Sequence, residues 1–109
     1  MPIIEAMACG KPVIATGWSA HTDFLTDDVG YRIQADKMIP AIAKCPYYDG
    51  FRWPEPDEAH LTHLLRHVYE NRDEAMAKGV RASEEVLAHW TWKHSAEKIK
   101  ARLLEIGVC

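Results

Sequence analysis

The feature that most constrains the fold is the opening segment, residues 2–16, in which a short helical stretch stops at a glycine and an apolar strand follows. Residues 6–8, Ala-Met-Ala, favour a helix. Gly10 supplies a C-terminal stop and Pro12 prevents the helix from continuing. Residues 13–15, Val-Ile-Ala, are a brief apolar run of the kind found in parallel strands that are covered on both faces. The segment predicts a helix that packs against a buried strand.

A second strand follows soon after the first. Residues 17–19 form a turn, and Ser19 is a predicted N-cap for a short helix over residues 20–25. Residues 29–33, Val-Gly-Tyr-Arg-Ile, then indicate another strand. A strand, helix, strand order implies a right-handed parallel crossover, so the fold class is predicted to be α/β with short parallel strands.

Helical patterns fill the C-terminal half. Asp57 is a predicted N-cap for a helix that runs to about Asn71, with an apolar stripe on one side. A second helix is expected over residues 72–89, and a third begins after Thr91 and ends at Gly107. The residues expected to face inward on the second helix are Ala75, Met76, Val80, Val86 and Leu87. Gly79, in the interior of that helix, costs about 1 kcal/mol relative to alanine and indicates close packing against a neighbour.

Residues 34–56 carry the weakest pattern. Residues 37–42 fit either an edge strand or a loop, because Pro40 interrupts a hydrogen-bonded ladder. The segment that follows is rich in aromatic residues, including Tyr47, Tyr48 and Trp53. Such a cluster is either packing within an ordered loop or a platform on which sugar rings stack, and the pattern favours packing.

Size and charge limit the classes of function. The 109 residues are enough for one domain, and the net charge of −3 with no basic stripe argues against nucleic acid as a partner. Cys9, Cys45 and Cys109 are widely spaced, as in reduced intracellular proteins, and Cys9 is expected to be a small buried hydrophobic residue. With no signal segment at its start, the chain is expected to be cytoplasmic, with peripheral attachment to a membrane left open.

Two clusters of polar residues suggest other sites. His60, His63 and His67 lie on one predicted helix, but no cysteine or carboxylate at a suitable spacing completes a metal site, so no metal is expected there. His21 and Asp23 lie close together in sequence, without a nucleophile, and are expected to be a solvated helix start or a contact with a ligand loop.

The run that starts at Ile3 and continues Ile-Glu-Ala-Met-Ala-Cys-Gly-Lys-Pro-Val-Ile-Ala resembles the C-terminal, donor-binding domain of the GT-B glycosyltransferases, in particular the retaining family 4 enzymes (glycosyl transferases group 1). Their signature holds two glutamates at a fixed spacing, and Glu5 matches the second. The first would lie before Met1. Asp23-Phe24-Leu25 and Gly30-Tyr31-Arg32-Ile33 also occupy positions that match the family, with Asp23 where many relatives carry glutamate.

The resemblance implies a site for a nucleotide-diphosphate sugar. In the family, the second glutamate binds the ribose and the main-chain amides just before it hold the diphosphate, so the resemblance implies donor binding by Glu5 and by the backbone of Ile3 and Ile4. It also implies transfer of a hexose with retention, to a sugar or lipid-linked acceptor, without a metal or other cofactor. No catalytic residue is assigned in this chain. Without the rest of the motif, Glu5 would be read as an ordinary solvated carboxylate of a helix.

The resemblance further implies that residues 1–109 are the second half of a Rossmann-like nucleotide-sugar-binding domain followed by its C-terminal helices. Such a fragment is expected to have no transferase activity alone and, because the edge of its sheet is exposed, to self-associate or be marginally stable. Two alternatives remain open. One is a helical interaction module in which Glu5 is merely structural, and the other is a nucleotide-sugar epimerase of the same fold.

Overall fold

The computed structural model describes residues 2–42 and 46–108. It begins with helix α1 (Pro2–Ala8), which ends as the sequence predicts. Gly10 has φ of 68°, its N–H donates to the Met7 carbonyl at 2.9 Å, and the Lys11 N–H donates to the Ala6 carbonyl at 3.0 Å. These bonds form a Schellman motif, in which the left-handed residue is usually a glycine. The chain therefore reverses sharply from α1 into the first strand.

Strands β1 (Ile14–Thr16) and β2 (Tyr31–Ile33) pair in parallel, with Ile14 opposite Tyr31. The segment between them contains the 3₁₀ helix η1 (Ser19–Asp23). The prediction that Ser19 caps an α-helix is wrong: Ser19 has φ of 54°, inside the 3₁₀ turn, and its carbonyl accepts a hydrogen bond from the Thr22 hydroxyl at 2.7 Å. The mixed α/β class with short parallel strands is confirmed.

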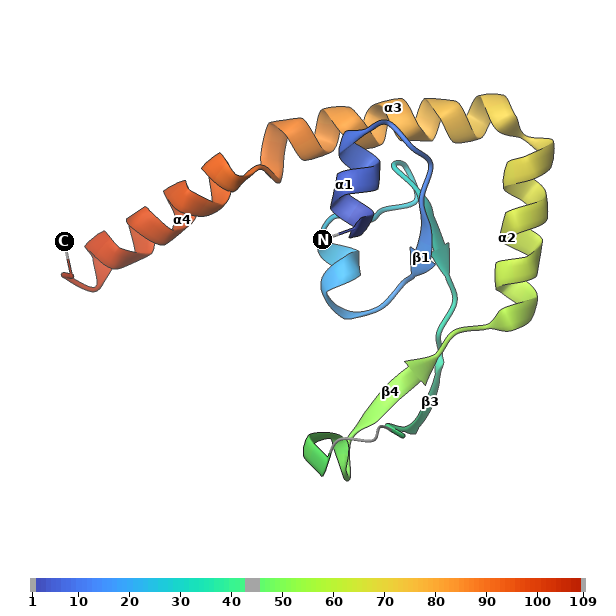
Figure 1. Cartoon of the computed structure of the whole chain (residues 1–109), viewed down its shortest axis with the longest axis horizontal. Coiled ribbons are helices and arrows are strands. Elements are labelled where there is room, and N and C mark those ends of the chain that lie inside the picture. Colours follow the sequence, from blue (N-terminus) through green and yellow to red (C-terminus); the bar gives the residue numbers. More distant parts are fainter. Residues whose placement is uncertain (1, 43–45, 109) are drawn as a thin grey trace.

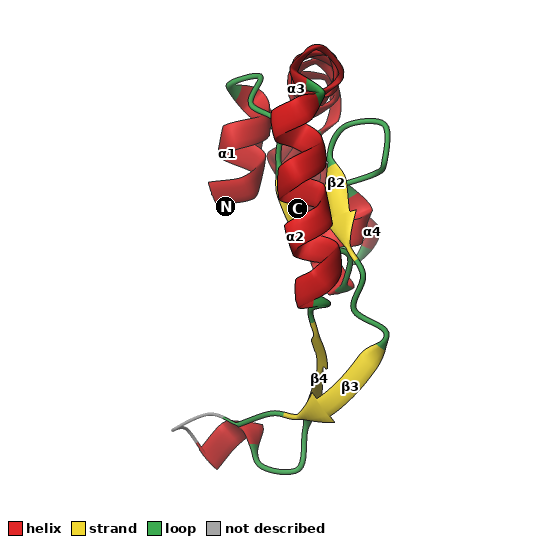
Figure 2. Ribbon diagram, turned by 90° about the vertical axis from the view of Figure 1, so that its right-hand side faces the viewer, coloured by secondary structure: helices red, strands yellow, loops and turns green. Residues whose placement is uncertain are grey.

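The segment with the weakest sequence pattern forms a β-hairpin. Strand β3 (Lys37–Pro40) pairs antiparallel with strand β4 (Arg52–Glu55), and a short 3₁₀ helix, η2 (Pro46–Tyr48), lies near its tip. In a two-stranded sheet each strand is an edge strand, which is why prolines are tolerated in both. The hairpin extends away from the rest of the molecule in two perpendicular views (Figures 1 and 2).

Helices α2 (Glu58–Glu70), α3 (Arg72–His89) and α4 (Trp92–Glu105) form the C-terminal half, with the bounds that the sequence predicts to within two residues. Asp57 caps α2, because its Oδ1 accepts the N–H of His60 at 2.8 Å. Thr91 caps α4, with its N–H bonded to Nδ1 of His94 at 3.3 Å. None of the described helices is long and apolar enough to cross a membrane.

The main core lies where α3 crosses α1 (Figure 1). Met7 and Leu25 are fully buried there. The face that α3 turns inward is made of Ala75, Gly79, Ala82 and Val86.

Part of the prediction for α3 is therefore wrong. Met76, Val80 and Leu87 are each more than half exposed. A Cβ on Gly79 would lie 2.2 Å from the carbonyl oxygen of Gly10, so the backbones of α3 and of the turn after α1 touch at this point. Such a close approach requires the small residues of α3, and not its large ones, to face the core.

A second cluster joins the sheet to α2. Tyr31 and Ile33 of β2 pack with Leu64 of α2 and Ala75 of α3. Leu61 and Val68, from the predicted apolar stripe of α2, extend this cluster, whereas Leu65 is exposed. In contrast, α4 has no buried residue and extends from the end of α3 away from the body (Figure 1).

Candidate functional site

Glu5 lies in the middle of α1 and its side chain is exposed. Among the hydrogen bonds and ion pairs between described residues, its carboxylate takes part in none. An ionised carboxylate only accepts hydrogen bonds, and it has room for two hydroxyl donors side by side. Among the described residues, nothing occupies the two carboxylate oxygens of Glu5.

Ile3 and Ile4 serve the fold through their side chains. Both are half-buried and pack against the main core cluster of Met7, Val13 and Leu25. Their backbone amides belong to the first turn of α1, where N–H groups have no partner within the helix. The side chains of these two residues thus contribute mainly to the core, while their backbone amides face the start of the helix.

Helix α3 holds α1 in place. The hydroxyl of Ser83 donates to the carbonyl of Ala8 at 2.9 Å, close to the contact between Gly79 and Gly10. Helix α1 and strand β1 run in opposite directions, so the first turn of α1 lies toward the carboxyl end of β1 (Figure 1). Ligands of open α/β sheets bind outside the carboxyl ends of the strands, and the first turn of α1 lies on that side.

A hollow runs along β2, from Asp27 before the strand to Asp36 after it, and its lining does not include Glu5. It is an open groove of ≈ 750 Å³. Its walls include Trp18 after β1, Asp36 after β2, His60 of α2 and Lys78 of α3. The sequence points to His60 only as a candidate for a metal site and does not point to the other three. The rule that could have found the first two is their place directly after parallel strands.

A short ion pair forms one wall of this groove. Nε of Arg32 donates to Oδ1 of Asp27 at 2.9 Å, and its terminal nitrogen reaches the other carboxylate oxygen. This hydrogen bond lowers the pKa of Asp27, with a further contribution from the guanidinium charge. Lys78 donates to the carbonyls of Asp27 and Gly30. These cations are engaged by the protein itself, and both lie away from Glu5.

A series of hydrogen-bonded side chains joins the sheet to the helices. The Tyr31 hydroxyl donates to Oε1 of Glu74 at 3.1 Å, and Oε2 of Glu74 contacts Nε2 of His67 at 3.1 Å. Burial raises the pKa of Tyr31 to about 12, helped by the bond to Glu74 and by its charge. The same bond from Tyr31, and then His67, lower the pKa of Glu74. This series of hydrogen bonds links β2, α2 and α3 through their side chains.

The three histidines of α2 do not form a metal site. Nδ1 of His60 accepts the N–H of Gln34 at 3.0 Å, and His67 is bonded to Glu74. The ring of His63 stacks 6.4 Å from that of His60, and is exposed. Within residues 2–42 and 46–108 no group of three or more His, Cys, Asp or Glu residues is placed to hold a metal ion.

His21 and Cys9 also differ from simple expectation. Nδ1 of His21 lies 3.2 Å from the carbonyl oxygen of Thr16 and its ring packs edge-on against Phe24, so it contacts the turn after β1 and not Asp23. The prediction that Cys9 is buried is wrong, because Cys9 is exposed at the C-terminal end of α1. Cys45 and Cys109 lie outside the described residues.

Comparison with known proteins places the chain in a family. Neither a curated protein nor a solved structure matches it significantly. The sequence model of the family described as glycosyl transferase-like matches residues 1–101, which is nearly the whole chain and includes Glu5, both parallel strands and most of α4. The chain therefore belongs to the glycosyl transferase-like family.

Proposed function

We propose that this chain supplies part of the donor site of a hexosyltransferase, which transfers a hexose from a nucleotide-diphosphate sugar. In this proposal the Glu5 carboxylate accepts hydrogen bonds from the ribose hydroxyls, and the backbone amides of Ile3 and Ile4 contact the diphosphate. The observation that carries the proposal is the family match, which includes Glu5, an exposed carboxylate of α1 that has no hydrogen bond or ion pair among the described residues.

The packing of α1 supports this assignment. A ribose site has to be held rigidly if it is to orient the sugar. Met7 is fully buried and the Gly10–Gly79 contact fixes the end of α1, so Glu5 stands on an anchored helix although its own side chain is exposed. The amides of the first turn favour negative charge, as a diphosphate requires.

The finer features of the proposal follow from the sequence resemblance. We place residues 1–109 in the second half of a GT-B-type, Rossmann-like donor domain of the retaining family 4 class, acting in the cytoplasm or peripherally at a membrane. The acceptor is then a sugar or a lipid-linked sugar. The departing diphosphate would be stabilised by protein groups and not by a metal.

A nucleotide titration followed by NMR tests the donor site. UDP, GDP and their hexose conjugates are added to the wild-type chain, to Glu5→Ala and to Glu84→Ala. Glu84 is an exposed glutamate on α3 and serves as the matched control. We expect amide shifts at residues 3–6 in the wild type and in the control. In Glu5→Ala we expect binding to weaken about tenfold, since hydrogen bonds to a charged group are lost.

The result also separates the alternative functions. If no nucleotide perturbs α1, the donor site proposal is wrong. The hypothesis that the chain is a helical interaction module would then gain support from the exposed apolar residues of α4. If nucleotides bind equally well to Glu5→Ala, the site lies elsewhere, and the groove beside Trp18 becomes the first place to examine.

A further inference from the structure

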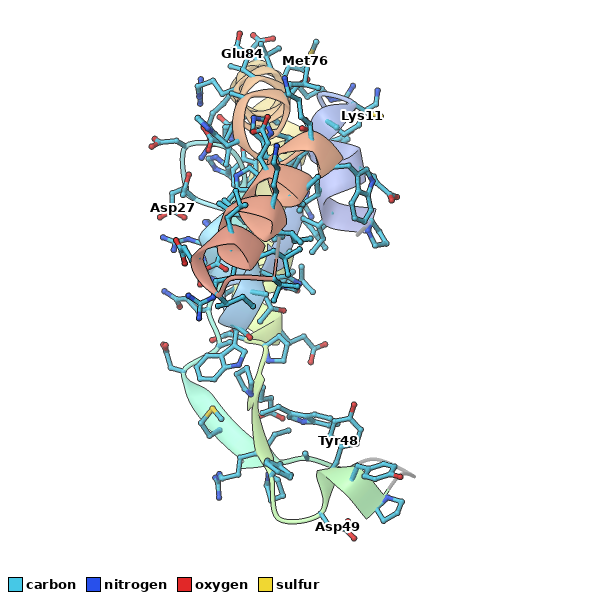
Figure 3. The ribbon with its side chains drawn as sticks, turned by 90° about the vertical axis from the view of Figure 1, so that its left-hand side faces the viewer. Lys11, Asp27, Tyr48, Asp49, Met76 and Glu84 are labelled. Atoms are coloured by element: carbon cyan, nitrogen blue, oxygen red, sulfur yellow. The ribbon has the colours of Figure 1, made fainter. Side chains whose placement is uncertain are left out.

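The β3–β4 hairpin carries a row of exposed aromatic rings. The rings of Tyr48 and Trp53 lie side by side, with centroids 6.0 Å apart and planes inclined by 55°. Trp53 is 36% exposed, Tyr48 48% and Phe51 65%. Tyr48 and Asp49 lie toward the far end of the hairpin in Figure 3. The hairpin packs mainly on itself, so these rings are not needed to fill the core of the molecule.

Charged side chains share a face with the aromatic row. The register places Lys37 opposite Glu55 and Ile39 opposite Trp53. Because alternate residues of a strand lie on the same face, Glu55 and Trp53 lie on one face, separated by about 7 Å. Nζ of Lys37 lies 2.5 Å from Oε2 of Glu55, which confirms that these side chains meet across the hairpin.

A polar hollow continues this face at the base of the hairpin. It has a volume of ≈ 410 Å³ and is lined by Gln34 and Asp36, by the Lys37–Glu55 pair, and by Asp57 and Glu58 at the start of α2. Amide and carboxylate oxygens of this kind accept hydrogen bonds from hydroxyl groups. An aromatic row thus leads directly into a group of hydroxyl acceptors.

We propose that this face binds a neutral carbohydrate chain, with one pyranose ring against Trp53 and Tyr48 and the hydroxyls of the next ring in the polar hollow. The C–H groups on one side of a pyranose pack against an aromatic face, and its hydroxyls need acceptors at the rim. Four carboxylates and one lysine line the hollow, so an anionic carbohydrate is repelled. As the acceptor of the reaction, this carbohydrate rests on the proposed function, but its binding to the hairpin does not require the donor.

The test is direct binding of neutral hexasaccharides to the 109-residue chain without nucleotide. The probes are maltohexaose, cellohexaose, chitohexaose and mannohexaose, with hexagalacturonate as the anionic comparison, and binding is measured by calorimetry and by NMR shifts. We expect at least one neutral probe to bind and to shift the amides of β4, and hexagalacturonate to bind more weakly. We expect Trp53→Ala to weaken binding at least about tenfold, and Trp53→Phe to retain part of it.

Controls separate loss of the site from loss of the fold. Trp92→Ala removes a tryptophan that is 80% exposed on α4 and is expected to leave binding unchanged. Glu55→Gln retains an acceptor oxygen but removes the charge, and is expected to weaken binding less than Trp53→Ala does. Circular dichroism checks that each variant is folded, and Tyr48→Ala provides a second substitution in the aromatic row.

Three outcomes would overturn the inference. These are no binding by any neutral probe, equal weakening in Trp53→Ala and Trp92→Ala, or adsorption to phosphatidylcholine vesicles that is lost in Trp53→Ala without any carbohydrate binding. The last would assign the aromatic row to a lipid surface. Because no nucleotide is present, each outcome leaves the donor site proposal to its own test.

Discussion

Gly79 is the residue at which one added side-chain atom would disturb the packing most. An added Cβ would meet the carbonyl oxygen of Gly10 at 2.2 Å, its carbonyl carbon at 2.9 Å and the nitrogen of Pro12 at 3.2 Å. All three are backbone atoms, which cannot turn away as a side chain can. The gain in helix propensity from alanine, about 1 kcal/mol, is therefore outweighed by overpacking.

We predict that Gly79→Ala lowers the free energy of unfolding by about 1–3 kcal/mol, measured by urea denaturation. Ala77→Ser is the matched control, because it adds one atom at an exposed position of the same helix and should change stability by about 0.5 kcal/mol or less. A Gly79→Ala variant as stable as the wild type would show that α1 and α3 can move apart at no cost.

At the scale of elements, the chain of side chains from Tyr31 through Glu74 to His67 ties β2 to α3 and α2. The pKa of Tyr31 is raised to about 12, so the folded state holds this proton more tightly than the unfolded state does. The stabilisation is therefore complete below pH 10 and is lost as the pH rises toward 12. Glu74 behaves in the opposite sense: its lowered pKa adds stability above about pH 4.5 that is lost in acid.

We predict that the wild type loses more stability between pH 9 and pH 12 than Tyr31→Phe does, with urea unfolding as the measurement. The variant keeps the ring and every other titrating group. The difference between the two stability curves therefore reports the titration of the Tyr31 hydroxyl alone. Parallel curves for the two proteins would show that the folded state does not raise the pKa of Tyr31.

The elements that could be predicted from the sequence are those with local signals. Gly10, Asp57 and Gly107 mark helix ends through their own backbone preference or side chain, and each acts as predicted. Ser19 looked like an N-cap but lies inside a 3₁₀ turn, where its neighbours and not its side chain set the backbone. Strand β4 was missed because prolines hide a strand whose only pairing is within a hairpin.

Contacts between distant segments could not be predicted from the sequence in the same way. Met76 and Val80 were expected inside, but the face of α3 is chosen by the close approach of Gly79 to Gly10, far away in the sequence. The candidate donor residue Glu5 was identified by resemblance alone, and its exposure agrees with a binding role without testing it. The groove beside the Arg32–Asp27 pair depends on tertiary structure, because its lining extends from Gly17 to Lys78.

The whole molecule is extended for its length. Its radius of gyration is 17.2 Å, compared with about 13 Å for a compact domain of this size. Two features account for the difference: the hairpin and α4, which extend from the body in different directions (Figure 1). Within the described part of the chain the parallel sheet has only two strands. Trp92 and Ile99 of α4, and Ile106 just after it, are more than half exposed.

We predict that the chain self-associates as its concentration rises, and that Trp92→Ser combined with Ile99→Ser weakens the association. Sedimentation velocity over a dilution series measures this directly. Met76→Ser, at an exposed apolar residue of α3, is the control and should have little effect. A single monomeric species at every concentration, for the wild type, would show that these surfaces do not pair with another copy.

The contact between Gly10 and Gly79 also has a consequence for folding during synthesis of the protein. These residues are about 70 positions apart, so α1 cannot be covered by α3 until the residues between them have been synthesised. At the usual rates of translation this takes roughly 3–14 s, during which the apolar side chains of Ile3, Ile4 and Met7 have no native partner on α3. The apolar side of α1 is thus expected to bind a chaperone until α3 has emerged.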